Sequence, residues 1–229
     1  MILAIDTALA ATSACLLAPG SLKPLSAETL FMEAGHAEAL LPLIDRVMAR
    51  EPEGFGALTR IAVTIGPGSF TGIRIGVAAA RAFGLAFRVP VVGLSTLAAL
   101  AAPALAVGAR PPIVAAIDAR HGNVYVQGFG PRGETLLGPA LMSAAEAARS
   151  LGSRPLKLIG SGGPLIARVA LALGITTDTD GFHALPDIDF VARLGLLADP
   201  DHAIARPLYL KSPDAKPPSP SGLLAAVIL

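Results

Sequence analysis

The sequence has little of the residue types that build disulfides, metal clusters or charged surfaces. Of its 229 residues, one is cysteine, none is tryptophan and 15% are charged. The single Cys15 excludes an internal disulfide framework and fits a reducing compartment, and its strand-like surroundings predict a buried thiol. The formal net charge of +1 gives no overall basic field. We therefore do not expect this chain to hold nucleic acid by itself.

Long hydrophobic runs and a secretory leader are missing as well. No apolar run reaches the roughly 18 residues needed to span a bilayer, and residues 1–6 lack the basic start and cleavage site of a signal peptide. We expect a cytoplasmic protein that makes no membrane contact. Hydrophobic residues nevertheless make up 53% of the chain. This excess indicates either a compact, alanine-rich protein or an apolar surface that a partner covers.

The order of apolar runs predicts an α/β protein with two successive units. In the first we expect strands at 2–5, 12–17, 28–32, 61–65 and 89–94, with helices at 36–50, 73–87 and 95–106. In the second we expect strands at 113–117, 123–129, 134–141 and 156–159, with helices at 143–150, 164–173 and 188–197. Two βββαβα lobes related by duplication resemble the actin-like ATPase (ASKHA) superfamily. The predicted domains are a first, partner-binding lobe (1–108), a second lobe (109–211) and a proline-rich tail (212–229).

Three loops lie where that architecture would hold a nucleotide, between the lobes. A carboxylate after a buried strand can hold hydrated Mg²⁺, and a glycine-rich turn lets the backbone approach a phosphate. The candidate residues for a residual nucleotide site are Asp6, Thr7, Asp118, Gly160, Gly162 and Gly163. The same residues serve equally well as turn formers and tight strand-to-helix connections. Arg120 stands where a phosphate-cradling hairpin needs glycine, so we expect no efficient ATP turnover.

The most specific stretch is the run of eleven residues from Gly66 to Gly76, GPGSFTGIRIG. Ser69 and Thr71 are candidate caps for the following helix, whose N-terminus is a potential anion site. Small residues recur every four positions, at Gly72, Gly76, Ala80 and Gly84. Glycine inside a helix costs on the order of 1 kcal/mol relative to alanine, so this stripe predicts that another element packs very close.

This stretch resembles the hallmark of the bacterial TsaB (YeaZ) family. Further similarity lies in residues 3–8, 95–97, 116–120 and 207–211, in the same order and spacing. The resemblance implies a role in making threonylcarbamoyladenosine in certain tRNAs. It implies that the chain pairs with TsaD, which transfers the threonylcarbamoyl group, that the ATPase TsaE joins them, and that tRNA is met through the complex. It implies that the chain has no cofactor of its own. It also implies that any ATP or ADP binds weakly, at an interface with a partner.

A metal site distinguishes TsaD, the catalyst of that pathway, from its TsaB partner. TsaD carries an H-x-E-x-H motif, and the corresponding positions here are Thr96 and Leu100, so we predict no metal site. His36 has Leu40 rather than histidine one turn later, and the remaining histidines are scattered. No serine lies in a recognisable nucleophile turn, so we predict no catalytic residues and no hydrolase.

The partner surface is predicted on the two long helices of the first lobe. The residues that we assign to it are Leu40, Leu43, Ile44, Val47, Arg74, Val77, Ala78 and Arg81. The period of the hydrophobic residues alone does not show which face of each helix points outward. The alternative is that half of these side chains pack against their own sheet. Without TsaD, the same helices predict a homodimer. The competing functional hypothesis is a self-contained small-molecule kinase or ATPase that uses Asp6 and Asp118 as metal-linked acids.

Overall fold

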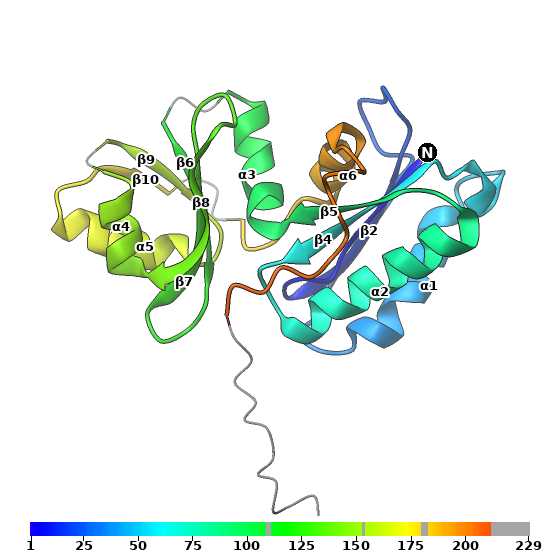
Figure 1. Ribbon diagram of the computed structural model, residues 1–229, viewed down its shortest axis with the longest axis horizontal. Coiled ribbons are helices and arrows are strands. Elements are labelled where there is room, and N and C mark those ends of the chain that lie inside the picture. The colour runs from blue at the N-terminus through cyan, green and yellow to red at the C-terminus, as the bar shows by residue number, and fades with distance from the viewer. Residues whose placement is uncertain (109–110, 153, 180–182, 212–229) are drawn as a thin grey trace, which may run out of the picture.

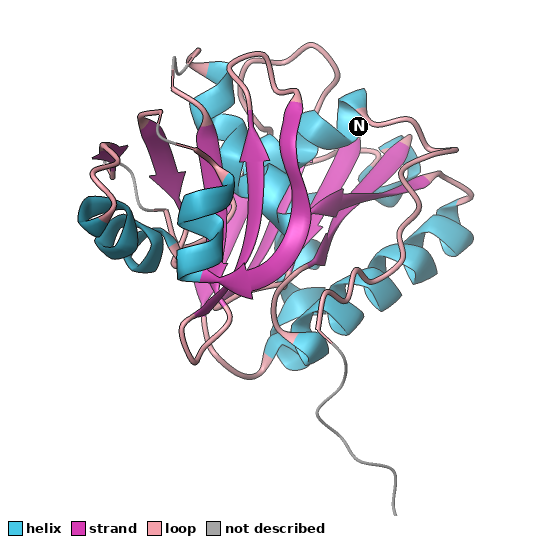
Figure 2. Cartoon of the chain, turned by 60° about the vertical axis from the view of Figure 1, so that its left-hand side comes forward, coloured by secondary structure: helices cyan, strands magenta, loops and turns pink. Residues whose placement is uncertain are grey.

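The computed structural model describes residues 1–108, 111–152, 154–179 and 183–211. They form two lobes, each built on a five-stranded mixed sheet flanked by helices (Figures 1 and 2). The strand orders are β3-β2-β1-β4-β5 and β10-β9-β6-β7-β8. In each sheet an antiparallel three-stranded meander is continued by parallel strands, so the two lobes repeat one plan. The predicted α/β fold with two related lobes is confirmed.

The first lobe follows the predicted element order closely. Strands β1 (Ile2–Asp6), β2 (Ala11–Leu17) and β3 (Ser26–Phe31) form the meander, and β4 (Arg60–Gly66) and β5 (Val91–Ser95) extend it in parallel. Helices α1 (His36–Met48) and α2 (Phe70–Phe87) lie together over one face of this sheet. A short 3₁₀ turn, Gly54–Ala57, was not predicted. Every residue of β1 and β2 is buried, in keeping with a sequence that is apolar except for Asp6, Thr12 and Ser13.

The second lobe repeats this plan with shorter helices. Its sheet contains β6 (Ile113–Asp118), β7 (Asn123–Phe129), β8 (Thr135–Ser143), β9 (Leu156–Ile159) and β10 (Thr177–Asp178). Helices α4 (Ala144–Ser150) and α5 (Gly163–Ala172) cover one face. A capping box joins Ser143 and Glu146 at the start of α4, and these backbone and hydroxyl hydrogen bonds hold the pKa of Glu146 below its usual range. The two-residue strand β10 is too short for a sequence pattern to predict.

Two helices, α3 (Thr96–Ala106) and α6 (Ile188–Leu197), lie between the sheets (Figure 1). Helix α6 follows the second lobe in sequence but packs on β1, β2 and β4 of the first. The guanidinium of Arg60 on β4 donates hydrogen bonds to three carbonyl oxygens at the end of α6, those of Gly195, Leu196 and Ala198. The predicted boundary at 109–211 is therefore corrected, because apolar residues of α6 bury the second face of the first sheet. Residues 212–229, the predicted tail, lie outside the described residues.

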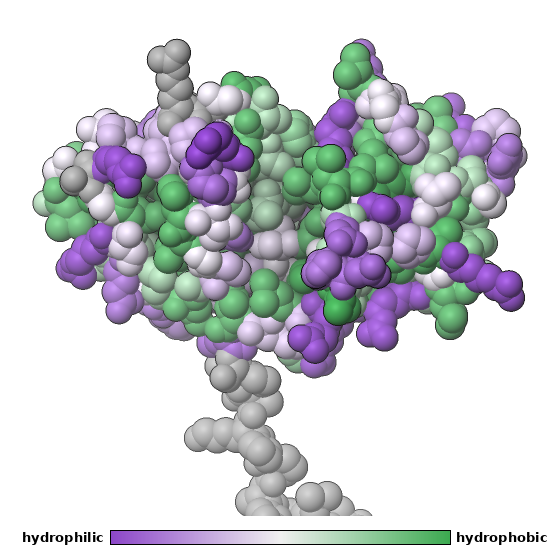
Figure 3. Space-filling model, turned by 45° about the horizontal axis from the view of Figure 1, so that its top comes forward, coloured by the Kyte–Doolittle hydropathy of each residue, from purple (hydrophilic) through white to green (hydrophobic). Residues whose placement is uncertain are grey.

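Helix α2 begins three residues earlier than predicted, directly after the cap residue Ser69. The Ser69 hydroxyl accepts a hydrogen bond from the Gly72 amide at 3.2 Å. Thr71 lies exposed in the first turn and is not the cap. By length and composition α2 could cross a membrane, contrary to the prediction that no segment reaches that length; one third of it is buried against the protein. Elsewhere on the surface, hydrophobic and hydrophilic side chains are interspersed over both lobes (Figure 3).

Candidate functional site

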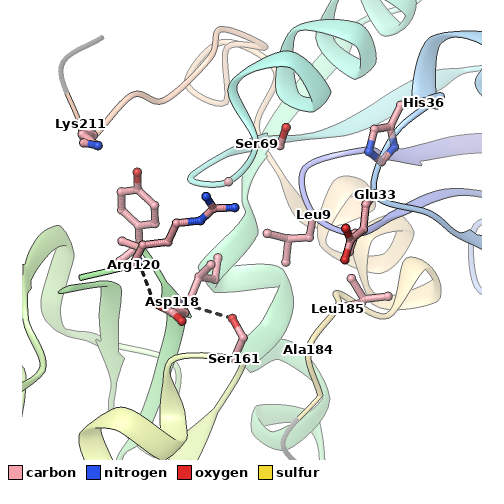
Figure 4. A pocket seen from close by; sticks show the side chains of 15 residues that line it. Leu9, Glu33, His36, Ser69, Asp118, Arg120, Ser161, Ala184, Leu185 and Lys211 are labelled. Carbon is pink, nitrogen blue, oxygen red and sulfur yellow. Dashed lines mark hydrogen bonds between the residues drawn. The ribbon is translucent and has the colours of Figure 1, made fainter. Parts of the chain in front are cut away.

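A cleft of about 550 Å³ opens between the two lobes. The β1–β2 loop and the start of α2 form one wall, and the β6–β7 turn forms the other (Figure 4). Its lining includes Leu9, Glu33, His36, Gly68, Ser69, Asp118, Arg120, Tyr125, Ser161, Leu185 and Lys211. The charged residues among them are of both signs, so the cleft has no single-sign field. Glu33, Tyr125 and Lys211 were missed by sequence reasoning, because only the closure of the two lobes brings them together.

Asp6 and Thr7, two of the predicted nucleotide residues, do not line this cleft. Asp6 is 1% exposed, and its Oδ1 accepts hydrogen bonds from the Thr64 hydroxyl and the Ala8 amide. Burial raises the pKa of Asp6, although the Thr64 and Ala8 hydrogen bonds and the nearby His36 act in the opposite direction. The Thr7 hydroxyl donates to the carbonyl oxygen of Gly72 at 2.7 Å. Thr7 is therefore held on α2, whereas Asp6 is held by Thr64 of β4 and by Ala8 and keeps one buried carboxylate oxygen, Oδ2, without a hydrogen-bond partner among the described residues.

The glycines of the GPGSFTGIRIG stretch explain why α2 lies so close. A Cβ added at Gly68 would overlap the carbonyl oxygen of Ala8, and one at Gly72 would overlap that of Thr7. At Gly76 it would meet the Thr7 hydroxyl at 2.5 Å. The predicted close packing of this helix is confirmed, and its partner is the loop between β1 and β2. The loop where we expected a nucleotide phosphate to approach is thus in contact with the backbone of α2.

The second-lobe candidates are also held by backbone hydrogen bonds. Asp118 is exposed at the cleft, and its carboxylate accepts from the Arg120 amide at 2.7 Å, while its own amide donates to the Ser161 hydroxyl (Figure 4). The amide of Gly162 donates to the Ala116 carbonyl oxygen, and that of Gly163 to Gly160. Gly160 has φ +90°, which favours glycine. Two of the amides expected to cradle a phosphate thus close the strand-to-helix connection instead.

A second hollow lies on the first lobe, between α1 and α2. It has a volume of about 520 Å³ and an entirely apolar lining: Ala37, Leu40, Leu41, Ile75, Ala78, Ala79, Ala82, Phe83, Ala86 and Phe87. We call it the α1/α2 groove. Leu41 is 57% exposed. At one end Phe83 and Phe87 stack with Phe55, with ring centroids 5.4 and 5.1 Å away, which gives that end a firm wall.

The structure divides the predicted partner residues into two groups. Five of them are buried in the core between α1, α2 and the first sheet: Leu40, Leu43, Ile44, Val47 and Val77. The prediction for these five is corrected, because a side chain that packs on its own sheet is not available to a partner; only Leu40 reaches the groove. Arg74, Ala78 and Arg81 are exposed on α2. Sequence reasoning missed Leu41, Ala82 and Ala86, which lie one helical step away on the outward face.

The positions that would carry a metal site after β5 are filled by core packing. Thr96 and Leu100, on α3, are 0% and 2% exposed, and Leu100 packs between α3 and the second sheet. Over the described residues, no group of three histidine, cysteine or carboxylate side chains is placed to hold a metal ion. His36 is buried with its Nδ1 2.8 Å from the Thr12 hydroxyl.

A family model described as TsaD, tRNA N6-adenosine threonylcarbamoyltransferase, matches residues 31–191. The Escherichia coli tRNA threonylcarbamoyladenosine biosynthesis protein TsaB is 36% identical over 124 residues, which are 54% of this chain and 52% of that protein. The chain thus spans about half the length of the curated TsaB relatives that it matches.

Two further similarities extend over nearly the whole chain. An uncharacterized protein of Mycobacterium tuberculosis is 30% identical over 224 residues, covering 94% of each chain. A Pseudomonas aeruginosa crystal structure, described as an uncharacterized protein with similarity to the peptidase YeaZ, has a TM-score of 0.73 at 26% identity. It covers 92% of this chain and 99% of its own.

Proposed function

The chain belongs to the TsaD-type family and, within it, to the TsaB (YeaZ) family, and from that premise we propose a scaffold function. The chain is a non-catalytic subunit of the machinery that makes threonylcarbamoyladenosine in tRNA. It binds the catalytic subunit TsaD through the α1/α2 groove and thereby supports TsaD activity. The observation that carries this proposal is the groove itself, because its lining is apolar throughout and lies open at the surface.

The composition of the groove supports a protein partner. Four alanines, at positions 78, 79, 82 and 86, make α2 thin on this side, so that a helix of the partner can approach closely. Leu41 of α1 and Phe83 of α2 flank them as larger apolar contacts. Contiguous exposed apolar surface of this kind marks an interaction site. The same geometry supports a homodimer through the groove when TsaD is absent.

The cleft supports the non-catalytic assignment. The kinase or ATPase hypothesis uses Asp6 and Asp118 as metal-linked acids; Asp118 is exposed at the cleft, whereas Asp6 is buried and does not line it. The α2 glycines also place the Thr7 hydroxyl on the helix backbone. The self-contained kinase or ATPase is therefore the weaker alternative. Nor does the described cleft place a serine and a histidine in hydrogen-bond contact, as a serine peptidase needs: Ser69 caps α2 and His36 is paired with Thr12.

The remaining parts of the proposal follow the family resemblance. TsaE joins the complex of this chain with TsaD, tRNA is modified on that complex, and ATP or ADP binds at an interface between subunits. The chain has no cofactor of its own in this proposal. In this proposal the chain contributes a binding surface for TsaD, and a test must therefore measure its association with TsaD.

Association with TsaD of the same organism tests the proposal, by light scattering or analytical ultracentrifugation. We expect a one-to-one complex with the unchanged chain and at least a tenfold weaker one with Leu41→Asp, because an unpaired carboxylate is costly in an apolar interface. The matched control is Leu171→Asp, at an 80% exposed leucine on α5 of the other lobe. Ile44→Asp is unsuitable because Ile44 is fully buried.

Two results would overturn this proposal. If no complex forms at tens of micromolar, the chain is not a TsaD scaffold. If Leu41→Asp and Leu171→Asp bind TsaD equally well, the partner surface is not the α1/α2 groove. Saturable ATP hydrolysis by the isolated chain would instead support the kinase or ATPase alternative.

A further inference from the structure

The C-terminal strap, residues 203–211, returns to the first lobe and ends beside the start of α2 (Figure 1). It continues the first sheet past β5: Val92 pairs with Ile204, and the amide of Leu208 donates to the carbonyl oxygen of Ile65 at 2.8 Å. This path brings Tyr209 against Phe70, with ring centroids 5.1 Å apart. Two rings far apart in the sequence thus share one surface.

Arg74 joins these two rings, whose planes are tilted by 35°, into one platform. Its guanidinium carbon lies 3.6 Å from the centroid of the Phe70 ring and 5.7 Å from that of Tyr209. Its Nε donates a hydrogen bond to the Tyr209 hydroxyl at 2.8 Å. Phe70 and Tyr209 remain 43% exposed. Exposed aromatic rings beside an oriented guanidinium form the kind of surface on which unpaired nucleobases stack.

Positive charge continues along α2 from this platform. Arg81 lies seven residues after Arg74 on one line of α2, roughly 10 Å along the helix, and Arg88 is the C-cap residue directly after the helix. Arg206 of the strap lines a hollow with Arg81. Neither α2 nor the strap contains an acidic residue. Within the described chain, none of these four guanidinium groups forms an ion pair.

We propose that this surface binds single-stranded RNA, with bases stacked on Phe70 and Tyr209 and phosphates against Arg74, Arg81, Arg88 and Arg206. The inference rests on the proposed function, because it gives the subunit a direct contact with the RNA that the complex modifies. Guanidinium groups favour phosphate, which they bind with two N–H groups at once. The near-neutral charge of the whole chain hides this cluster, since acidic residues elsewhere balance it.

The RNA surface and the α1/α2 groove lie on different lines of the same helix. At about 100° per residue, Ala79 lies about 140° from Arg74 and Ala82 about 100° from Arg81, whereas Ala78, which also lines the groove, lies about 40° from Arg74. The strap flanks the opposite side of this arginine line. Leu41, on α1, belongs to the groove and Arg206, on the strap, belongs to the arginine surface, so the two kinds of binding are separable by mutation.

Fluorescence anisotropy with a labelled 12-nucleotide single-stranded RNA and the full chain tests the proposal. Four phosphate contacts predict about 50-fold weaker binding when salt rises from 50 to 200 mM. In the double variant Arg81→Gln/Arg206→Gln, two contacts remain and the same change should weaken binding only about 7-fold. The control is Arg168→Gln, an exposed arginine on α5 of the second lobe that forms no ion pair among the described residues.

A second variant tests the stacking separately. Phe70→Leu keeps an apolar side chain and all charges, and we expect it to weaken binding roughly fivefold or more to the single strand. It should not change binding to a duplex of the same length, whose bases are already stacked. Circular dichroism checks that each variant is folded.

Several outcomes would overturn the inference. These are no measurable binding at 50 mM salt, an equal loss in Arg168→Gln, or a Phe70→Leu variant that binds RNA like the unchanged chain. Binding of polyglutamate instead of RNA, with the same sensitivity to Arg81→Gln/Arg206→Gln, would assign the surface to an acidic protein segment. The assay contains no TsaD, and Leu41→Asp should bind RNA normally, so failure here is distinct from failure of the scaffold proposal.

Discussion

Thr7 and Gly72 lie 65 residues apart in sequence, yet the Thr7 hydroxyl donates a 2.7 Å hydrogen bond to the Gly72 carbonyl oxygen. The contact fixes the start of α2 on the loop after β1. Gly72 lacks a Cβ, and this lets the helix approach until its backbone meets that of Thr7. Gly76 lies against the same residue, whereas Gly84, further along the stripe, lies against Val91.

The first prediction concerns Gly72→Ala. In a helix, alanine is ordinarily more stable than glycine by about 1 kcal/mol. Here we expect the opposite sign, a loss of about 1–3 kcal/mol in the free energy of unfolding, because the new methyl group overlaps the Thr7 carbonyl. Urea denaturation measures it. Gly138→Ala is the control, since nothing lies within 4 Å of a Cβ there; an equal loss in both variants would contradict the close-packing explanation.

The elements of this fold were predictable because their signals are local. Apolar runs such as 2–5 and 61–65 are long enough to mark buried strands, and Asn123–Phe129 and Ile188–Leu197 coincide with the predicted ranges. The stripe of small residues on α2 correctly indicated a close neighbour. The identity of that neighbour, the loop at Thr7, depends on contacts across 65 residues, which no periodicity contains.

What failed was the assignment of faces. Helix α1 is apolar on two sides, and Ile44 and Leu41, both apolar, point to the core and to solvent respectively. Hydrophobicity alone does not distinguish a core side chain from an exposed apolar one. The sequence-based prediction therefore assigned buried residues to the partner surface. The packing of α6 on the first lobe was missed for a similar reason. Its position in the chain suggests that it belongs to the second lobe. It packs on the first because that sheet otherwise has one apolar face without a covering helix.

The second prediction concerns the pH dependence that Asp6 imposes. Burial raises its pKa in the folded state above the unfolded value, so the native state holds the proton more tightly. The stabilisation is complete below the unfolded pKa and is lost as the pH rises through the folded pKa. Relative to Asp6→Asn, the unchanged chain should therefore lose stability as the pH increases from about 4, as urea denaturation at several pH values measures.

Thr64→Val is the companion to that experiment. The Thr64 hydroxyl donates to Asp6 and lowers its pKa, so removing the hydroxyl should raise the folded pKa further. The range of pH over which stability is lost should then extend upward. If Asp6→Asn and the unchanged chain show parallel pH profiles, the carboxyl does not titrate differently in the folded state.

The third prediction concerns the reactivity of Cys15. It is fully buried on β2, and burial, with Asp189 and Asp187 as the next contributions, raises its pKa to about 12. Because the thiolate is the reactive form, we expect no reaction with Ellman's reagent at pH 8 in the native chain and one equivalent after unfolding in guanidinium. Leu22→Cys, at an 87% exposed position, is the positive control. Rapid native labelling at Cys15 would contradict the burial.

The fourth prediction concerns the link that Arg60 makes between β4 and the end of α6. Its Nη1 donates to the carbonyl oxygens of Gly195 and Ala198 at 2.8 Å each and of Leu196 at 3.1 Å. Such hydrogen bonds from a charged donor are worth about 1.5–3 kcal/mol, so we expect Arg60→Met to lose about that much stability. Arg168→Met should change stability by less than about 0.5 kcal/mol. Equal unfolding midpoints for the two variants would show that Arg60 does not hold α6.

The same arrangement predicts that residues 1–108 do not fold alone. Helix α6 covers the sheet face formed by Ile2, Ala4, Cys15, Leu17 and Ala62, and a chain that ends at 108 leaves that face in water. We expect the fragment to bind the dye ANS and to lack a cooperative unfolding transition, since burying apolar surface is what stabilises a sheet. A fragment 1–108 with a sharp transition would show that the first lobe is complete without α6, and would restore the sequence-based boundary.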